Sequence, residues 1–420
     1  MKRLVTFAVM WVLIVGLVMG VTIKFWTAPN PLQEEFWKPL VEEWNAKHPD
    51  IQIEWRTIPA ARSSEEAILT AIAAGEGPDI CTNIFSGFAA QLAEQDQLVD
   101  FAKEFGVDFW ILVGARRMEN IVEGWKLGDH YYVIPIYANP MVMWWRKDKL
   151  QELGFNRPPR TYGEIYELAK KYANPPEKFA MIVLKGRNWW DRWFDFISFY
   201  YAASGGKPYI DTAAGKAVFN NEYGKKVAEF IYTMFKNKWT TSDWGKVFPL
   251  ANGKALGSLM GPWSLNWAKE NYPEVYNNLW ISPLPVPDDY PEGKPVKTFA
   301  DTKGLVMFKS CKYKKEAFEF IKWVFMNPVN DARWIEITKM PPARGDLATN
   351  PLFAKYMEED PYFAAYAREV GNAVPPALIT NTIDVQEAMT TFLTEPLMYL
   401  KATPDEALEK AVKEINKLLW

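Results

Sequence analysis

Residues 63–86 read SSEEAILTAIAAGEGPDICTNIFS, a helical stretch that stops at a glycine and leads into an apolar run. Ser63 with Glu66 three positions later forms a capping box, which marks the amino end of a helix. Gly75 stands where a left-handed residue is expected to end that helix. The apolar residues 79–85 then predict a strand. The stretch therefore predicts a helix followed by a strand that ends in small polar side chains.

The chain ahead of this stretch alternates in the same way. It predicts a strand, a helix and a strand over residues 21–26, 32–44 and 51–58. Such alternation is typical of an α/β fold with a mostly parallel sheet, in which ligands bind beyond the carboxyl ends of strands. Asn83 and Ser86 are therefore expected to border a ligand cleft. Asp79, at the start of its strand, is expected to accept backbone N–H groups of the GEGPD turn instead.

The alternation continues along the rest of the chain. Strands are predicted over 131–145 (a pair), 179–184 and 305–310, and helices over 161–173, 189–206 and from 403 toward 420. Thr161 with Glu164 and Thr403 with Glu406 form two further capping boxes. Five prolines within residues 281–304 predict an irregular connection between two parts of the molecule.

Length and composition set the broad class. With 420 residues and 49% hydrophobic content, the chain can bury a large core in two domains or one bilobal body. The net charge of -3 gives no overall basic surface for nucleic acid. Lys2-Arg3, the apolar residues 4–18 and the small residue Gly20 predict a signal peptide over 1–20 and an exported, periplasmic or extracytoplasmic protein. The alternative is an uncleaved anchor, because residues 4–23 approach bilayer-spanning length.

Metal and disulfide chemistry have few residues to draw on. Cys81 and Cys311 are the two cysteines, and buried thiols are the favoured interpretation, although an exported chain could oxidise them as one pair. His48 and His130 are the two histidines, both in turn contexts. No zinc cluster and no cofactor are therefore expected.

Six stretches, taken in order, resemble the bacterial extracellular solute-binding proteins of sugar importers, the group that includes maltose-binding protein. They are EEWNAKHPDIQIE (42–54), LTAIAAGEGPDI (69–80), YYVIPIYANPMVMWWRKDKLQELGFNRPPRTYGEIYELAKK (131–171), NGKALGSLMGPWS (252–264), MPPARGD (340–346) and TPDEALEKAVKEIN (403–416). The resemblance implies the type II periplasmic-binding-protein fold, in which two hinge-linked α/β lobes close over a ligand cleft. It places lobe 1 at 21–136 plus 304–345 and lobe 2 at 137–303 plus 346–420.

The resemblance also implies a set of ligand contacts at matching positions of this sequence. These are Trp26, Thr27, Asn30, Asn83, Ser86, Tyr137, Asn139, Asn188, Trp190, Asp191, Trp263 and Ser264. Asp301 and Arg344 are added to the set, each either reaching the cleft or forming a structural ion pair. Asn139 stands where maltose-type relatives often carry an acidic residue, which argues against a maltodextrin.

Aromatic and amide side chains together suit a carbohydrate. The chain holds 20 tryptophans, and an indole face can lie against the C–H groups of a sugar while Asn, Asp and Ser pair with its hydroxyls. Most of these tryptophans are expected to be core. Trp263 is assigned to the cleft rather than the core, since Gly261-Pro262 forms a turn that can hold its ring. Of the neighbours Trp189 and Trp190, which cannot both face the ligand, Trp190 is chosen.

The sequence therefore predicts a monomeric solute-binding protein, not an enzyme, that delivers a carbohydrate or polyol to the membrane permease of an ABC importer. One alternative is an exported glycoside-active enzyme, which needs a pair of carboxylates, but 51 acidic residues make some pair inevitable. No nucleophile-elbow, HExxH or P-loop motif stands out. Another alternative is a ligand sensor for a membrane receptor. The identity of the sugar or polyol stays open.

Overall fold

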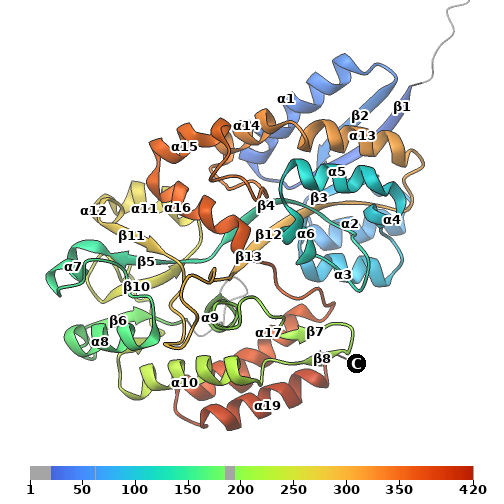
Figure 1. Cartoon of the computed structure of the whole chain (residues 1–420). Coiled ribbons are helices and arrows are strands. Elements are labelled where there is room, and N and C mark those ends of the chain that lie inside the picture. The colour runs from blue at the N-terminus through green and yellow to red at the C-terminus, as the bar shows by residue number, and fades with distance from the viewer. Residues whose placement is uncertain (1–19, 62, 185–193, 420) are drawn as a thin grey trace, which may run out of the picture.

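The computed structural model describes residues 20–61, 63–184 and 194–419, so the predicted leader over residues 1–19 lies outside the described residues. The chain forms two α/β lobes, each built on its own sheet (Figure 1). Two neighbouring strands, β4 (Ile134–Pro140) and β12 (Thr298–Met307), pass between the lobes. None of the helices in the described part of the chain reaches the length and hydrophobicity of a bilayer span.

The first sheet has the strand order β13-β12-β3-β1-β2, with β4 beside β12. Its further strands are β1 (Val21–Thr27), β2 (Ile51–Thr57), β3 (Ile80–Ile84) and β13 (Ala373–Val374). β1 pairs in parallel with β2 and β3, whereas β12 pairs with β3 and β4 in antiparallel fashion. The parallel sheet expected from the amino-terminal alternation is therefore confirmed for β1 to β3.

Eight helices of the described residues accompany this sheet: α1 (Pro31–Lys47), α2 (Ser64–Ala73), α3 (Ser86–Glu94), α4 (Phe101–Phe105), α5 (Val107–Ala115), α6 (Glu119–Glu123), α13 (Lys314–Phe325) and α14 (Pro328–Thr338). Their apolar sides fill two core clusters on the sheet. Edge-on aromatic contacts join α1 and α13 to β1, such as Phe25 with Trp37 at 4.9 Å and with Phe320 at 5.6 Å.

The second sheet has the order β11-β5-β10-β6-β9. Its strands are β5 (Val142–Arg146), β6 (Phe179–Ile182), β9 (Thr240–Thr241), β10 (Ala255–Met260) and β11 (Leu279–Ser282). The surrounding elements are α7 (Lys147–Glu152), α8 (Tyr162–Tyr172), α9 (Phe194–Ser204), α10 (Glu222–Lys236), α11 (Ser264–Asn271), α12 (Pro273–Asn277), α17 (Thr382–Met389), α18 (Glu395–Met398), α19 (Pro404–Asn416) and the small hairpin β7 (Ile210–Asp211) and β8 (Lys216–Ala217).

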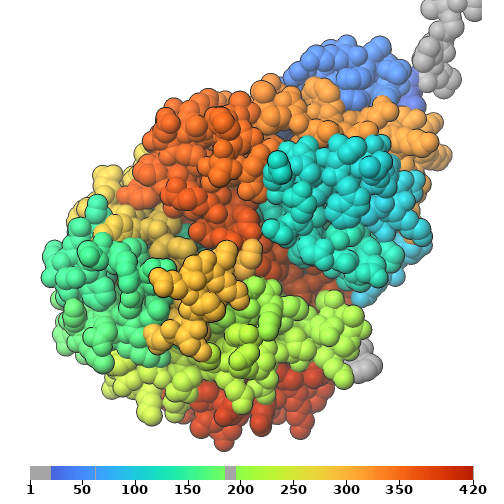
Figure 2. Space-filling model, in the orientation of Figure 1, coloured from blue at the N-terminus to red at the C-terminus, as the bar shows by residue number. Residues whose placement is uncertain are grey.

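The lobe boundaries predicted from the resemblance stay predictions, because the segment after Gly345 contacts both cores. This segment includes α15 (Ala354–Glu359) and α16 (Pro361–Glu369). Phe353 and Phe363 are buried in the first core, whereas Tyr366 belongs to a cluster of the second. In Figure 2 the orange helices of this segment accordingly touch both the cyan helices of the first lobe and the yellow elements of the second.

The local signals of the sequence are confirmed in detail. The Ser63 hydroxyl accepts a hydrogen bond from the Glu66 N–H, and Gly75 has φ +74°. Thr403 and Glu406 form the complete capping box at the start of α19. The predicted helix over 189–206 is seen from Phe194, because 189–193 lie outside the described residues.

Two features of the first sheet refine the sequence interpretation. Residues 298–304, predicted to belong to the irregular proline-rich connection, instead form the first part of β12. The reason is that each residue from Ala300 to Lys303 pairs with a residue of β4, which gives the backbone a regular partner. Asp79 does accept a backbone N–H, but the donor is Lys24 of β1 at 2.8 Å rather than the turn.

The two cysteines are free and buried, which confirms the thiol interpretation. Burial raises the pKa of both thiols, to about 12 for Cys311. Neither thiol is therefore ionised at neutral pH.

Candidate ligand-binding site

The strand register brings the carboxyl edges of the two sheets together. β1 and β3 are parallel, and Gly304 of β12 lies opposite Ile84 at the end of β3. β4 runs beside β12 from this edge and continues directly into β5, where Val142 lies opposite Met260 at the end of β10. β4 therefore connects the carboxyl edge of the first sheet with the carboxyl end of β10. We call the region between Ile84 at the end of β3 and Met260 at the end of β10 the facing edges.

Four side chains share one face of the β4–β12 pair. Asp301 lies opposite Asn139 and Lys303 lies opposite Tyr137, and because side chains alternate along a strand, these four point to the same side. Lys303 makes an ion pair with Asp301 at 3.7 Å and covers the Phe85 ring at 5.4 Å. We call these four residues the crossover face. Two charged and two neutral polar side chains therefore lie together between the lobes.

Asn139 is the most informative member of the crossover face. Its side chain is buried, with 4% exposed, and its Oδ1 has no hydrogen-bond partner in the described part of the chain. A buried acceptor without a partner costs about 1 to 3 kcal/mol. An amide oxygen in this state at the facing edges indicates a place where a ligand donor can bind.

Tyr137 is held tightly beside it. Its ring stacks on Trp334 with centroids 5.8 Å apart, and its side chain hydrogen-bonds with Gln33. Burial raises the pKa of Tyr137 well above its ordinary value, and the Asp301 carboxylate adds to this shift. The hydroxyl therefore stays protonated at physiological pH.

On the second lobe, Trp263 and Ser264 follow β10 at the amino end of α11. Trp263 is 46% exposed, whereas Ser264 is buried. A Cβ added to Gly261 would lie 2.2 Å from the Trp263 ring, so the indole packs directly on the glycine. The expected role of Gly261 as a support for this ring thus has a structural basis, and an exposed indole stands at the end of β10.

The first-lobe residues of the predicted set lie at their strand ends but differ in access. Thr27 is fully buried and its hydroxyl accepts from the Trp55 indole N–H at 3.0 Å. Asn30 caps α1 by accepting from the N–H groups of residues 32 and 33. Asn83 has φ +63° and donates to Ser64 at 3.3 Å. Ser86 is buried, and its hydroxyl has no partner in the described part of the chain.

Trp26 is placed in the core of the first lobe. It is 1% exposed within an apolar cluster, and the Arg56 guanidinium covers its ring at 4.1 Å. A strand residue at this position can face either side of the sheet, and Trp26 faces the helix layer. The structure therefore does not support it as a ligand contact. Asn188, Trp190 and Asp191 lie outside the described residues.

Arg344 is likewise occupied within its own lobe. Its guanidinium makes four N–H···O contacts, to Asp331, to both oxygens of Asp346 and to the Ala115 carbonyl. Only 2% of its side chain is exposed. Of the two roles left open for Arg344, the structure shows the structural ion pair and does not support a ligand contact.

Lys303 is a member of the crossover face that the sequence analysis missed. The signal was present in ADTKG (300–304), where Asp301 and Lys303 are two positions apart and so share a strand face. It was overlooked because these residues were assigned to an irregular connection.

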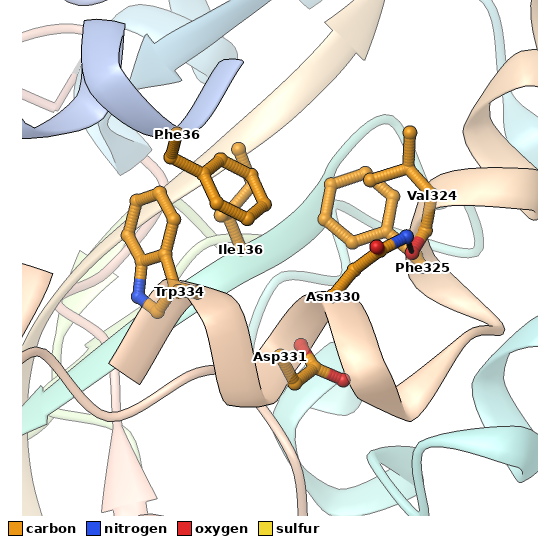
Figure 3. Close-up of a pocket in the computed structure, with 7 residues that line it drawn as sticks. All are labelled: Phe36, Ile136, Val324, Phe325, Asn330, Asp331 and Trp334. Atoms are coloured by element: carbon orange, nitrogen blue, oxygen red, sulfur yellow. Dashed lines mark hydrogen bonds between the residues drawn. The ribbon is translucent and has the colours of Figure 1, made fainter. Parts of the chain in front are cut away.

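A small cavity of about 10 Å³ lies inside the first lobe rather than at the facing edges. Its lining residues are Phe36, Ile136, Val324, Phe325, Asn330, Asp331 and Trp334 (Figure 3). This volume holds a single water molecule at most. The cavity is therefore a packing feature of the first core and not the site of a sugar. No group of three or more His, Cys, Asp or Glu suited to a metal ion occurs among the described residues.

The two lobes, their crossover strands and the facing edges define a two-lobed protein with the periplasmic-binding-protein fold. The sequence pattern of the bacterial extracellular solute-binding protein family matches residues 29–330, and the chain belongs to that family. An uncharacterized protein of Listeria monocytogenes has a similar structure, with a TM-score of 0.90 and 32% identity over 95% of this chain and all of that one.

Two relatives carry names that state a ligand. The maltotriose-binding protein of Pyrococcus abyssi is 26% identical over 73% of this chain, and the match spans 63% of that protein's length. The arabinooligosaccharide-binding protein of Bacillus subtilis is 21% identical over 94% of this chain and 92% of that protein. The family is one of extracellular binding proteins, which gives the chain an extracytoplasmic location.

Replacing Asn139 by Ala is expected to weaken ligand binding without lowering the stability of the ligand-free protein. The loss of a buried hydrogen bond costs about 1 to 3 kcal/mol, at least about fivefold in affinity. Ligand-free protein should melt at the same temperature or higher, since the amide oxygen has no partner there. Calorimetry with deoxy analogues checks the assignment, because an analogue lacking the paired hydroxyl should bind parent and variant alike. An equal loss for every analogue would contradict it.

Proposed function

We propose that this protein captures a carbohydrate or polyol between its lobes and delivers it to the membrane permease of an ABC importer. The observation that carries the proposal is the pairing of chemistries at the facing edges. The exposed Trp263 offers an apolar face, and the crossover face offers the unpaired Asn139 oxygen together with Asp301 and Lys303. A sugar has both the C–H face and the hydroxyls that this combination requires. The names of the two relatives support the same ligand class.

The proposal extends to export and to the absence of catalysis. A leader ending at Gly20 would release a monomeric protein beginning at Val21, directly at the start of β1, and the mass of exported protein tests this. No turnover is expected, because the contacts named above include one carboxylate, Asp301, whereas glycoside hydrolysis needs a pair. A bound sugar should be recovered unchanged after long incubation.

A thermal-shift screen tests the function itself. A ligand that binds only the folded state raises the melting temperature, by an amount that grows with its concentration over Kd. Sugars, polyols and sugar phosphates form the panel, and calorimetry on each hit measures affinity. We expect at least one sugar or polyol to bind, while amino acids and peptides in a matched set do not. A panel without a carbohydrate or polyol hit would contradict the proposal.

Ligand is expected to favour a closed arrangement of the lobes. Pro375 is tied to the second lobe through the Tyr201 hydroxyl, which donates to its carbonyl at 3.0 Å, and it packs against Gly124 at the end of α6 in the first lobe. A Cβ added to Gly124 would lie 2.6 Å from the proline ring. A ligand held by both lobes favours the arrangement in which they are close, so saturating ligand should reduce the radius of gyration measured by small-angle scattering. Gly124→Leu places a larger side chain against Pro375 and should prevent this reduction.

The Gly124→Leu variant tests whether a reduced radius of gyration reflects closure of the lobes or a general compaction of the protein. Gly114→Leu is a matched control, because an added Cβ there meets only the Glu119 side chain at 3.9 Å. Closure would be disproved if tightly bound ligand left the radius of the parent protein unchanged.

A further inference from the structure

An exposed aromatic surface extends from Trp263 across the second lobe. Trp263 is the N-cap residue of α11 and Trp267 lies within the same helix. Residues four apart occupy the same face of a helix, so both indoles lie on one side of α11. They are 46% and 38% exposed. We call Trp263, Trp267 and the nearby Trp244 the aromatic strip.

The second ring of the strip is fixed by its neighbours. Trp267 contacts Phe248 and Tyr272 edge-on, with ring centroids 5.0 and 5.1 Å apart. Phe248 is 1% exposed and stacks on Trp244 at 5.6 Å. A ring held in this way loses little side-chain freedom when a ligand covers it. The strip is therefore a preorganised surface rather than a set of unrelated exposed side chains.

The positions of Trp263 and Trp267 along α11 suit a chain of sugars. Four residues of helix rise by about 6 Å, which is comparable with the length that one pyranose adds to an oligosaccharide. Asn266 is exposed in the same turn, where its amide can pair with a hydroxyl beside an aromatic face. Each of these two tryptophans can therefore offer a face to one sugar unit.

We propose that the aromatic strip binds the second and later units of an oligosaccharide whose first unit contacts Trp263. The ligand class is then an oligosaccharide rather than a monosaccharide or a polyol. This inference rests on the proposed function and deepens it, since it begins at the same indole and continues away from the facing edges. The strip continues from the indole of the proposed site, and the rigid support of Trp267 suits stacking of a further sugar unit.

A length series tests the inference by calorimetry. The probes are glucose to maltotetraose and arabinose to arabinotetraose. In at least one series the parent protein should bind more tightly as the chain lengthens. Trp267→Ala should weaken binding of the longer members by about fivefold or more, the effect of one lost aromatic contact, and leave the shortest bound member unchanged. Trp267→Phe should recover part of the loss.

Trp110→Ala is the matched control, because Trp110 of α5 is 43% exposed on the other lobe. It should bind every probe as the parent does. The inference is overturned if Trp267→Ala binds all lengths like the parent. This holds even if the variant loses transport, because the strip would then contact a protein instead of a sugar. It is also overturned if the parent binds a monosaccharide or polyol and no longer chain, an outcome that leaves the proposed function intact. Failure of every carbohydrate to bind would reject both.

Discussion

Replacing Asp331 by Asn is expected to lower the free energy of unfolding by about 3 to 5 kcal/mol, because it removes the carboxylate that pairs with buried Arg116 and one of the two that pair with Arg344. Asp331 pairs with Arg116 at 3.0 Å and with Arg344 at 2.9 Å. The side chains of the two arginines are 0% and 2% exposed. An uncompensated charge at such depth costs far more than an exposed one. Denaturant unfolding followed by tryptophan fluorescence measures the change.

An exposed pair provides the comparison for this experiment. Glu152 contacts Lys149 at 2.7 Å, but both side chains are largely in solvent. Glu152→Gln should therefore change the stability by less than about 1 kcal/mol. If Asp331→Asn has an effect as small as this, water must reach the two arginines and the cluster does not act as a buried one.

The cluster of Asp331, Arg116 and Arg344 is not expected to contribute to ligand binding. Asp331 lies on α14, and α14 also carries Trp334, on which Tyr137 stacks. The arginine cluster thus positions the helix behind the crossover face without reaching the facing edges. Under conditions where the variant is folded, its affinity for ligand should stay close to that of the parent.

Short-range signals made most of the fold predictable. The helix–strand alternation from Val21 to Ile84 and the capping residues Ser63, Thr161 and Thr403 all depend on neighbours within a few positions. Local side-chain and backbone chemistry determines such features. A single sequence therefore contains what is needed to place them.

Long-range pairing is what the sequence could not supply. Arg344 lies 13 residues from Asp331, and Arg116 lies 215 residues from it, so nothing local to PPARGD indicates that its arginine is buried. The same limit applies to β12, whose proline-rich approach suggested a loop although β4 provides its partner. Trp26 illustrates a related gap, because a strand-end position does not tell which face of the sheet a side chain takes.

The candidate site could be predicted as positions but not as an arrangement. Tyr137, Asn139 and Asp301 were identified separately, on two segments more than 160 residues apart in the sequence. Only the register that sets Asp301 opposite Asn139 shows that they share one face. The unpaired Asn139 oxygen follows from that packing and has no sequence signal of its own.

Replacing Trp263 by Ala is expected to weaken binding of every ligand the protein accepts, by about 2 kcal/mol or more, which is more than about tenfold in affinity. The indole is large and exposed at the end of β10. Removing it takes away an apolar face and admits solvent beside the ligand. Unlike the Asn139 change, it should affect deoxy analogues and parent sugars equally, because stacking does not depend on one hydroxyl. Calorimetry on the panel hits measures both effects.

Gly261→Ala tests whether the position of the ring matters as much as its presence. The added Cβ would lie 2.2 Å from the Trp263 ring, closer than any real contact, so the indole must move. This variant keeps the tryptophan and should still lose affinity, whereas Trp263→Phe keeps a smaller face and should lose less than Trp263→Ala. If a folded Trp263→Ala protein binds like the parent, Trp263 is not a ligand contact. The aromatic face of the site must then come from another residue, and the assignment built on MGPWS is wrong.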